Sequence, residues 1–198
     1  MTSPEWAYWY AYKVIKGCWP EAEVVIKTNP EWAYKYALNI IKDRWPEAEM
    51  AIVTSSYWAY RYALYVIKGR CAEGEEIIKT SPEWAYKYAL NIIKDRWPEA
   101  EAEAIIVTSP KWTYRYARDV IKDRWPEGEE IIKTSPEWAY RYALDVIKGC
   151  WSEAETAIVT SSYWAYRYAH EVIKAGSLNY QKLIQNSSMH IVKNDLVY

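Results

Sequence analysis

Apolar positions recur along the chain with helical spacing, and the whole pattern returns about every 26 residues. A first-row tryptophan marks each copy, at Trp6, Trp32, Trp58, Trp84, Trp112, Trp138 and Trp164. A second-row tryptophan follows in five copies, at Trp19, Trp45, Trp97, Trp125 and Trp151, and Cys71 takes its place in the third copy. Seven tandem copies of this length are typical of a helical solenoid, in which each copy packs mainly on its neighbours.

Each copy contains two helix-start signals. In the sixth copy, Ser135–Glu137 places an N-cap serine before a proline at the first helical position. Lys148 and then Gly149 supply a cation followed by a glycine stop. Trp125–Glu127 begins a shorter helix with acidic residues at its positive end. Each copy is therefore predicted to form a helix of about 14 residues, a tight turn and a helix of about 8 residues.

The longer helix is apolar over most of its circumference. In the sixth copy Arg141, Asp145 and Lys148 share a narrow polar arc, whereas Ala139 and Ala143 lie at the centre of the apolar one. Such a helix must be sandwiched between neighbours, and the alanines are expected to permit close helix approach. We also expect the first-row indoles to lie in the core, where truncation to alanine costs about 3–5 kcal/mol.

The shorter helix shows one apolar stripe, made in the fourth copy by Ala100, Ile105 and Ile106, and is expected to form an outer layer. The fourth copy also carries two extra residues within Glu99–Ala104. Two residues inserted in a helix rotate the part after them by about 200°. Either that helix extends into its loop, or the solenoid bends there.

The predicted fold is all-α. It is an α-solenoid of seven two-helix repeats of about 26 residues over residues 1–174, with a C-terminal capping segment over residues 175–198. Within that segment, Ser177–Asn186 is expected to form a capped amphipathic helix. Ser188–Tyr198 is compatible with a strand, a helix or an arm.

Composition adds information about origin and location. The chain of 198 residues has 20 Tyr and 13 Trp but no Phe, which indicates amplification of one short ancestral segment. Its net charge of −1 gives no overall attraction to nucleic acid or anionic lipid, and no apolar run approaches the roughly 20 residues of a membrane span. Three cysteines without C-x-x-C spacing indicate a reducing compartment. The first repeat begins at Ser3, so we expect no signal peptide and a cytoplasmic location.

Patterns for catalysis and metal binding are lacking in the sequence. Histidine occurs only at His170 and His190, and neither accompanies a serine or cysteine motif for nucleophilic catalysis. The glycines form no phosphate-binding loop. The acidic runs at 99–103 and 127–130 lie at helix starts, where they compensate the helix dipole. We therefore expect a non-enzymatic protein that uses no cofactor and no metal ion.

Basic residues recur at one position of the longer helix, at Lys35, Arg61, Lys87, Arg115, Arg141 and Arg167, and a second lysine row lies beside them. Such rows could follow a single-stranded nucleic acid with one base per repeat. However, Asp119, Asp145 and Glu171 share the polar arc and are spaced for i,i+4 ion pairs with the basic row. A solvated, partly self-paired stripe is therefore the favoured interpretation.

The first copy departs from the others, because Trp9 replaces a basic residue and Tyr12 replaces the leucine of most copies. Solenoid ends are usually polar. These two aromatic residues indicate either local packing at the terminus or an end-on contact with a second copy of the chain.

The unit W-A-Y-R-Y-A-x-D-V-I-K-x-R-W-P-E-A-E covers residues 3–174 and resembles short helical tandem-repeat proteins predicted in bacteriophage and large DNA virus genomes. The resemblance implies a viral protein located in the cytoplasm of the host cell. It carries over no functional residues. The period and signature differ from those of tetratricopeptide repeats.

We expect the protein to bind another protein, as a scaffold or as a phage-type inhibitor that occludes the surface of a host or defence protein. The expected contact residues are the basic row from Lys35 to Arg167 together with Trp9 and Tyr12, because Tyr, Trp and Arg are enriched in binding hot spots. Two alternatives stay open. One is a structural protein that self-assembles by end-on stacking, and the other is a protein that binds single-stranded nucleic acid along the Arg and Lys rows.

Overall fold

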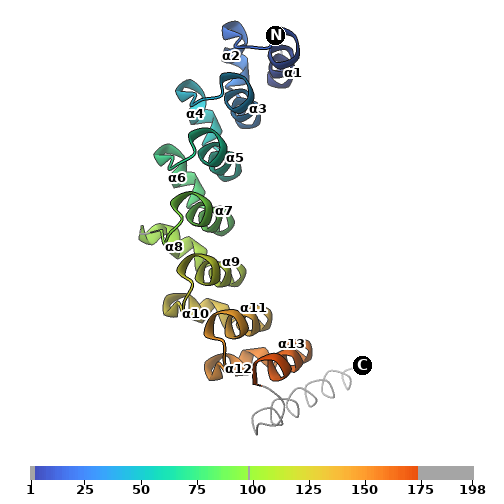
Figure 1. Ribbon diagram of the computed structural model, residues 1–198, viewed down its shortest axis with the longest axis vertical. Coiled ribbons are helices and arrows are strands. Elements are labelled where there is room, and N and C mark those ends of the chain that lie inside the picture. Colours follow the sequence, from blue (N-terminus) through green and yellow to red (C-terminus); the bar gives the residue numbers. More distant parts are fainter. Residues whose placement is uncertain (1–2, 98, 174–198) are drawn as a thin grey trace. The chain divides into compact units, whose positions relative to one another are not determined.

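The computed structural model describes residues 3–97 and 99–173, and all regular structure within them is helical (Figure 1). The chain divides into two compact units between Ile105 and Ile106. In both units a longer helical segment alternates with a short helix, which confirms the predicted all-α repeat solenoid. The predicted capping segment, 175–198, lies outside the described residues, and so do the helix expected over 177–186 and the three alternatives for 188–198.

Each longer segment is an α-helix of seven residues that continues directly into a π-helix of five residues. In the first unit these pairs are α1 (Pro4–Tyr10) with η1 (Ala11–Ile15), α3 (Pro30–Tyr36) with η2 (Ala37–Ile41), α5 (Ser56–Tyr62) with η3 (Ala63–Ile67), and α7 (Pro82–Tyr88) with η4 (Ala89–Ile93). In the second unit they are α9 (Pro110–Tyr116) with η5 (Ala117–Ile121), α11 (Pro136–Tyr142) with η6 (Ala143–Ile147), and α13 (Ser162–Tyr168) with η7 (Ala169–Ile173). An extended serine or asparagine precedes each one, usually followed by proline at the first helical position, as the sequence predicts.

The short helices also have seven residues each, and they are α2 (Pro20–Ile26), α4 (Pro46–Ile52), α6 (Ala72–Ile78), α8 (Ala100–Ile106), α10 (Pro126–Ile132) and α12 (Ser152–Ile158). Within each unit they lie together on one side of the longer segments (Figure 1). They form the second layer that their single apolar stripe predicts.

The two extra residues of the fourth repeat lie in front of its short helix. Helix α8 has the same length as its counterparts, but it begins three residues after Trp97, whereas α4 begins directly after Trp45. Ala100 is consequently exposed, and Ala102 is the alanine that is buried with Ile106. The prediction that Ala100 belongs to the apolar stripe was therefore wrong, and so was the proposed extension of the helix.

A lysine in the left-handed conformation ends the longer segments. Lys148 has φ 58° and donates its backbone N–H to the carbonyl of Ala143, five residues back. Gly149 donates its N–H to the same carbonyl at 3.2 Å. This double bonding is typical of a helix stop with a left-handed residue, and the wide π turn places that residue one position before the glycine. The helix therefore stops where the sequence predicts, but lysine and not glycine takes the left-handed conformation.

Alanine and tyrosine fill most of the space between successive longer segments. Ala139 and Ala143 are fully buried, as the helical wheel predicts, and the equivalent alanines of the other repeats are buried as well. The second-row tryptophans Trp97, Trp125 and Trp151 are also buried, against the short helices that follow them.

The first-row tryptophans lie at the rim of this core. Trp58 and Trp84 are half-buried, and Trp6 is 53% exposed. Trp58 covers the ring of Tyr34 in the preceding repeat, with the ring centroids 5.3 Å apart. The expectation that these indoles are core residues was wrong, because alanine pairs bring the helices too close together for an indole to enter between them.

A further tyrosine of the longer segments links successive repeats through its hydroxyl. Tyr62 accepts the backbone N–H of Trp45 at 2.7 Å and donates to the carboxylate of Glu49 at 3.1 Å, both in the preceding repeat. The same two bonds recur at the residues here called the linking tyrosines: Tyr36, Tyr62, Tyr88, Tyr142 and Tyr168. Phenylalanine has no hydroxyl for this link, which gives a structural reason for tyrosine at this position of the repeat.

Candidate functional site

The lysines of the predicted basic row are engaged within their own repeats. Lys87 pairs with Glu83 at 2.5 Å, and its ammonium lies 4.1 Å from the ring centroid of Trp84. Lys35 repeats this arrangement with the corresponding acid and indole. The charge of these lysines is therefore partly neutralised, and their side chains cover the exposed surface of the first-row tryptophans.

The first arginines of the row are held by aromatic residues. The guanidinium of Arg61 donates to the hydroxyls of Tyr34 at 3.3 Å and Tyr57 at 3.0 Å. The guanidinium of Arg115 lies 5.0 Å from the ring centroid of Trp112. These arginines stabilise the rim of the core and are only partly available to a partner.

The last arginines of the row form ion pairs with acids of the same helix. Arg167 pairs with Glu171 at 2.7 Å, which is the predicted i,i+4 pair. Arg141 pairs instead with Glu137, at 3.1 Å, while Asp145 accepts a hydrogen bond from a buried tyrosine of the preceding repeat. The row is thus partly self-paired, as the sequence favoured, and its other arginines are held by aromatic residues.

The two aromatic residues by which the first repeat differs from the others lie together. Trp9 and Tyr12 are 43% and 40% exposed, with their ring centroids 6.0 Å apart, and Tyr12 stacks on the buried ring of Tyr8. The ammonium of Lys13 lies 5.7 Å from the Trp9 ring and 5.1 Å from the Tyr12 ring. The structure therefore brings together the two aromatic residues that the sequence singles out and adds a lysine to them.

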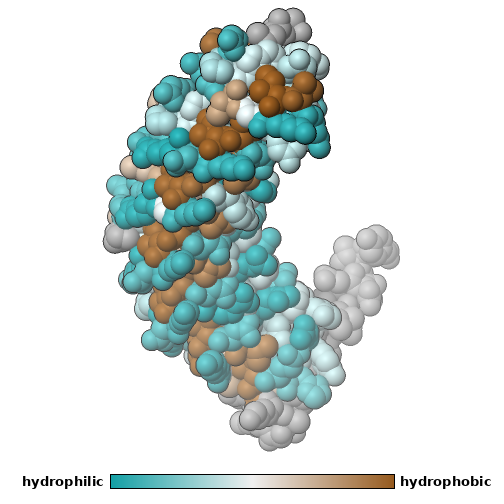
Figure 2. Space-filling model, turned by 45° about the horizontal axis from the view of Figure 1, so that its top comes forward, coloured by the Kyte–Doolittle hydropathy of each residue, from teal (hydrophilic) through white to brown (hydrophobic). Residues whose placement is uncertain are grey.

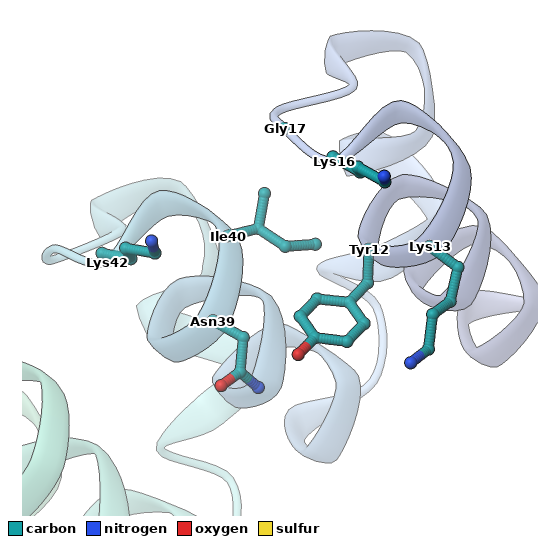
Figure 3. A pocket seen from close by; sticks show the side chains of 7 residues that line it. All are labelled: Tyr12, Lys13, Lys16, Gly17, Asn39, Ile40 and Lys42. Atoms are coloured by element: carbon teal, nitrogen blue, oxygen red, sulfur yellow. The ribbon is translucent and has the colours of Figure 1, made fainter.

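A hollow of about 400 Å³ lies beside these residues, between η1 and η2 (Figure 3). Across it, Ile40 and Asn39 of η2 face the ring of Tyr12 on η1 (Figure 3). Together with Trp9, its lining residues are here called the N-terminal site: Tyr12, Lys13, Lys16, Gly17, Asn39, Ile40 and Lys42.

The N-terminal site is positively charged. Lys13, Lys16 and Lys42 contribute three ammonium groups, and no carboxylate lines the hollow. None of the three forms an ion pair with any residue that the structure describes. The site therefore offers uncompensated positive charge beside an aromatic ring and an aliphatic side chain. This combination suits an anionic group attached to an apolar one.

Comparisons with protein-family models, curated proteins and solved structures give no match. The geometry of the site must therefore carry the functional argument. Within residues 3–97 and 99–173, histidine, cysteine and carboxylate side chains form no group of three that could hold a metal ion. In the same part of the chain, every helix is too short or too polar to cross a membrane.

A second hollow, of about 430 Å³, lies in the first unit beside the short helices. It is lined by Cys18, Pro20, Glu23, Val24, Lys27, Ile41, Arg44, Trp45 and Glu47. Its two carboxylates balance its two cations, so its charge indicates no particular class of ligand.

Sequence reasoning singled out Trp9 and Tyr12 and recognised the lysine row that contains Lys16 and Lys42, but it did not place these lysines or Lys13 in one site with the two aromatic residues. A signal was present for Lys13, because the other copies carry Asn, Tyr, Asp or Glu at this position. No signal distinguished Lys16 and Lys42, since lysine stands at that position in every copy. Only the packing of η1 against η2 shows that these two lysines border one hollow.

Proposed function

We propose that the chain is a non-enzymatic binding protein that holds an acidic segment of another protein in the N-terminal site. The repeats of the first unit form a rigid support for the site, since buried alanines and linking tyrosines join each repeat to the next. A partner held there has part of its surface covered. The protein then acts as a scaffold or as an inhibitor by occlusion.

One observation carries this proposal: the departures of the first repeat from the common pattern converge on the hollow. Trp9, Tyr12 and Lys13 stand where the second repeat has Lys35, Leu38 and Asn39. All three side chains are exposed, so they contribute little to folding. Exposed aromatic residues that gather beside a concave surface are typical of binding sites.

The chemistry of the site favours an acidic partner. Three lysines without ion-pair partners among the described residues attract carboxylates and disfavour a basic segment through repulsion and desolvation. Tyr12 and Ile40 offer apolar contact between these charges. A segment that combines acidic and apolar side chains satisfies both parts of the site.

Selection from a random peptide library tests the proposal. The wild-type chain and a variant with Trp9→Lys, Tyr12→Leu and Lys13→Asn are used as separate baits. This variant carries the residues of the second repeat, so it should keep the fold, and equal circular dichroism spectra verify this. We expect the wild type to enrich acidic peptides and the variant to bind them at least about tenfold more weakly. Selection of the same peptides by both baits, or of peptides without acidic residues, would overturn the proposal.

The resemblance of the repeat to proteins of bacteriophages and large DNA viruses supports one form of this function. In that form the bound segment belongs to a host or defence protein in the cytoplasm, and occlusion of its surface is the effect. Purified candidate host proteins that contain a selected acidic motif can be tested for loss of activity when the chain is added. Unchanged activity at saturation leaves the scaffold form as the proposal.

Self-assembly is a second candidate, favoured by the apolar surface of the first repeat. Val14 is 59% exposed, Ile15 is 42% exposed and Trp6 is 53% exposed. In later repeats the equivalent tryptophans cover a tyrosine of the preceding repeat, and a second copy of the chain could supply such a surface. Light scattering should then show a mass that rises with concentration and a return to monomer in Val14→Glu. A monomer mass at every concentration excludes this candidate.

A further inference from the structure

The lysines that end the longer segments occupy an unfavourable backbone conformation. In the first unit, Lys16, Lys42, Lys68 and Lys94 have φ between 58° and 62°. Glycine or asparagine adopts this left-handed conformation at a lower cost. The fold alone would favour glycine here, yet each position carries lysine.

The side chains of these lysines do not compensate for the cost within the described chain. All four are exposed, and none forms an ion pair with a described residue. The helix dipole favours a cation in the last turn, but a lysine placed one or two residues earlier would serve that purpose without strain. Strain that the structure does not explain is a reason to consider function.

Apolar side chains accompany each of these lysines. Val66 and Ile67 precede Lys68, Ile92 and Ile93 precede Lys94, and all four apolar residues are partly exposed. On the face seen in Figure 2, apolar patches alternate with hydrophilic ones within each unit. Each repeat of the first unit therefore presents a cation beside a small apolar surface.

The spacing of the repeats sets the spacing of a ligand. Axes of packed helices lie about 8–10 Å apart. A peptide in the polyproline II conformation advances about 3.1 Å per residue and returns every third side chain to the same face. One repeat therefore corresponds to about three residues of such a peptide.

We propose that the four lysines Lys16, Lys42, Lys68 and Lys94, here called the lysine edge, bind a protein segment in the extended polyproline II conformation with an acidic residue at every third position. This inference rests on the proposed function and extends it, because Lys16 and Lys42 belong to the N-terminal site. The segment enters the hollow and continues over the third and fourth repeats. Each acidic side chain meets one lysine, and apolar residues between them cover the valine and isoleucine pairs.

Three observations favour a peptide over a single-stranded nucleic acid. Tyrosines that recur along the first unit, such as Tyr34 and Tyr60, are buried and offer no free face on which bases could stack. Exposed rings such as those of Tyr12 and Tyr65 do not recur from repeat to repeat, so no ladder of exposed tyrosine rings follows the lysines in the described chain. The arginine and lysine row is engaged with indoles and acids. The apolar pairs beside the lysine edge would bury no apolar surface against a sugar-phosphate backbone, which is polar.

Fluorescence anisotropy of the full chain at low ionic strength tests the inference with three probes. The first is a peptide with glutamate at every third position and valine or serine between. The second has the same composition with all glutamates in one block, and the third is an oligothymidine of equal charge. Each is titrated with the wild type, with Lys68→Gln plus Lys94→Gln, and with the matched control Lys35→Gln plus Lys87→Gln. The variant with Trp9→Lys, Tyr12→Leu and Lys13→Asn is titrated as a fourth protein.

We expect the spaced peptide to bind most tightly to the wild type. The Lys68 and Lys94 variant should bind this peptide about three- to tenfold more weakly, because it loses two exposed ion pairs. The control variant should change the affinity for the spaced peptide by less than about twofold. If the Lys68 and Lys94 variant binds as the wild type does while the Trp9, Tyr12 and Lys13 variant loses binding, the extended edge is wrong and the proposed function stands. Equal binding of both peptides, or no binding of either, also contradicts the proposal that the lysine edge binds a segment with spaced acidic residues. Tighter binding of oligothymidine overturns it in favour of nucleic acid.

Discussion

Replacing Tyr62 by phenylalanine tests the link between repeats at a single atom. The ring of Tyr62 is fully buried and should keep its packing, so the variant loses only the hydroxyl. That oxygen accepts the N–H of Trp45 at 2.7 Å and donates to Glu49 at 3.1 Å. Both partners lie in the preceding repeat, and both are buried.

The two lost bonds differ in cost. Glu49 keeps two hydrogen bonds from Arg44, at 2.5 and 2.9 Å, and this guanidinium already holds the pKa of Glu49 below its usual value. The N–H of Trp45 has no such second partner among the described residues, and a buried donor without an acceptor costs about 1–3 kcal/mol. We expect the free energy of unfolding to fall by about 2 kcal/mol. For a chain of this size the melting temperature should fall by about 4–8 °C.

Urea and thermal unfolding, followed by circular dichroism of the helical backbone, measure this change. Tyr10→Phe is the matched control, because Tyr10 holds the same position in the first repeat and its hydroxyl bonds to no described residue. It should change stability by less than about 0.5 kcal/mol. Equal stability of Tyr62→Phe and the wild type, or equal losses in both variants, would refute the role assigned to the hydroxyl.

Burial and backbone geometry lead to four other predictions. Trp125→Ala should cost about 3–5 kcal/mol, whereas Trp84→Ala should cost less because that indole is only partly buried; equal losses in urea unfolding would contradict this. In mildly alkaline solution, iodoacetamide should label the exposed Cys18 and spare Cys71, since burial raises the pKa of the Cys71 thiol to about 11; mass spectrometry would contradict this by finding equal labelling. Lys68→Val should lose more than about 1 kcal/mol, because a β-branched residue fits the left-handed conformation poorly, while Lys68→Asn should lose nothing in the same unfolding assay. Burial raises the pKa of the linking tyrosines above its usual value of 10.0, so the stability that they contribute is present below pH 10.0 and is lost as the pH rises further. Tyrosinate absorbance should therefore rise together with the loss of helix. Ionisation of these tyrosines without unfolding would contradict this.

The helical repeat was predictable because its signals are local. Proline after an extended serine or asparagine sets each helix start, and the positions of Ala139 and Ala143 on the wheel identify the buried face. Comparison between the repeats also identified Trp9 and Tyr12 as residues that differ from the common pattern. These inferences needed only residue spacing within one repeat.

The remaining features depend on contacts between repeats. An indole such as that of Trp84 is equally apolar at the rim and in the core, so only the distance between helices decides its place. The left-handed lysines result from a π-helical ending that helix propensity does not predict. Lys16 and Lys42 are 26 residues apart in sequence, and only the packing of two π-helices makes them neighbours of one hollow.

Carbodiimide cross-linking of a bound acidic peptide measures the proposed contact most directly. This reagent joins a carboxylate to an amine in direct contact, and mass spectrometry identifies the lysine that reacted. We predict that the peptide couples first to Lys13, Lys16 and Lys42, which border the hollow, and that a peptide long enough to follow the lysine edge couples to Lys68 and Lys94 as well. Coupling spread evenly over lysines elsewhere on the chain, or centred on Lys35 and Lys87, would contradict binding in the N-terminal site.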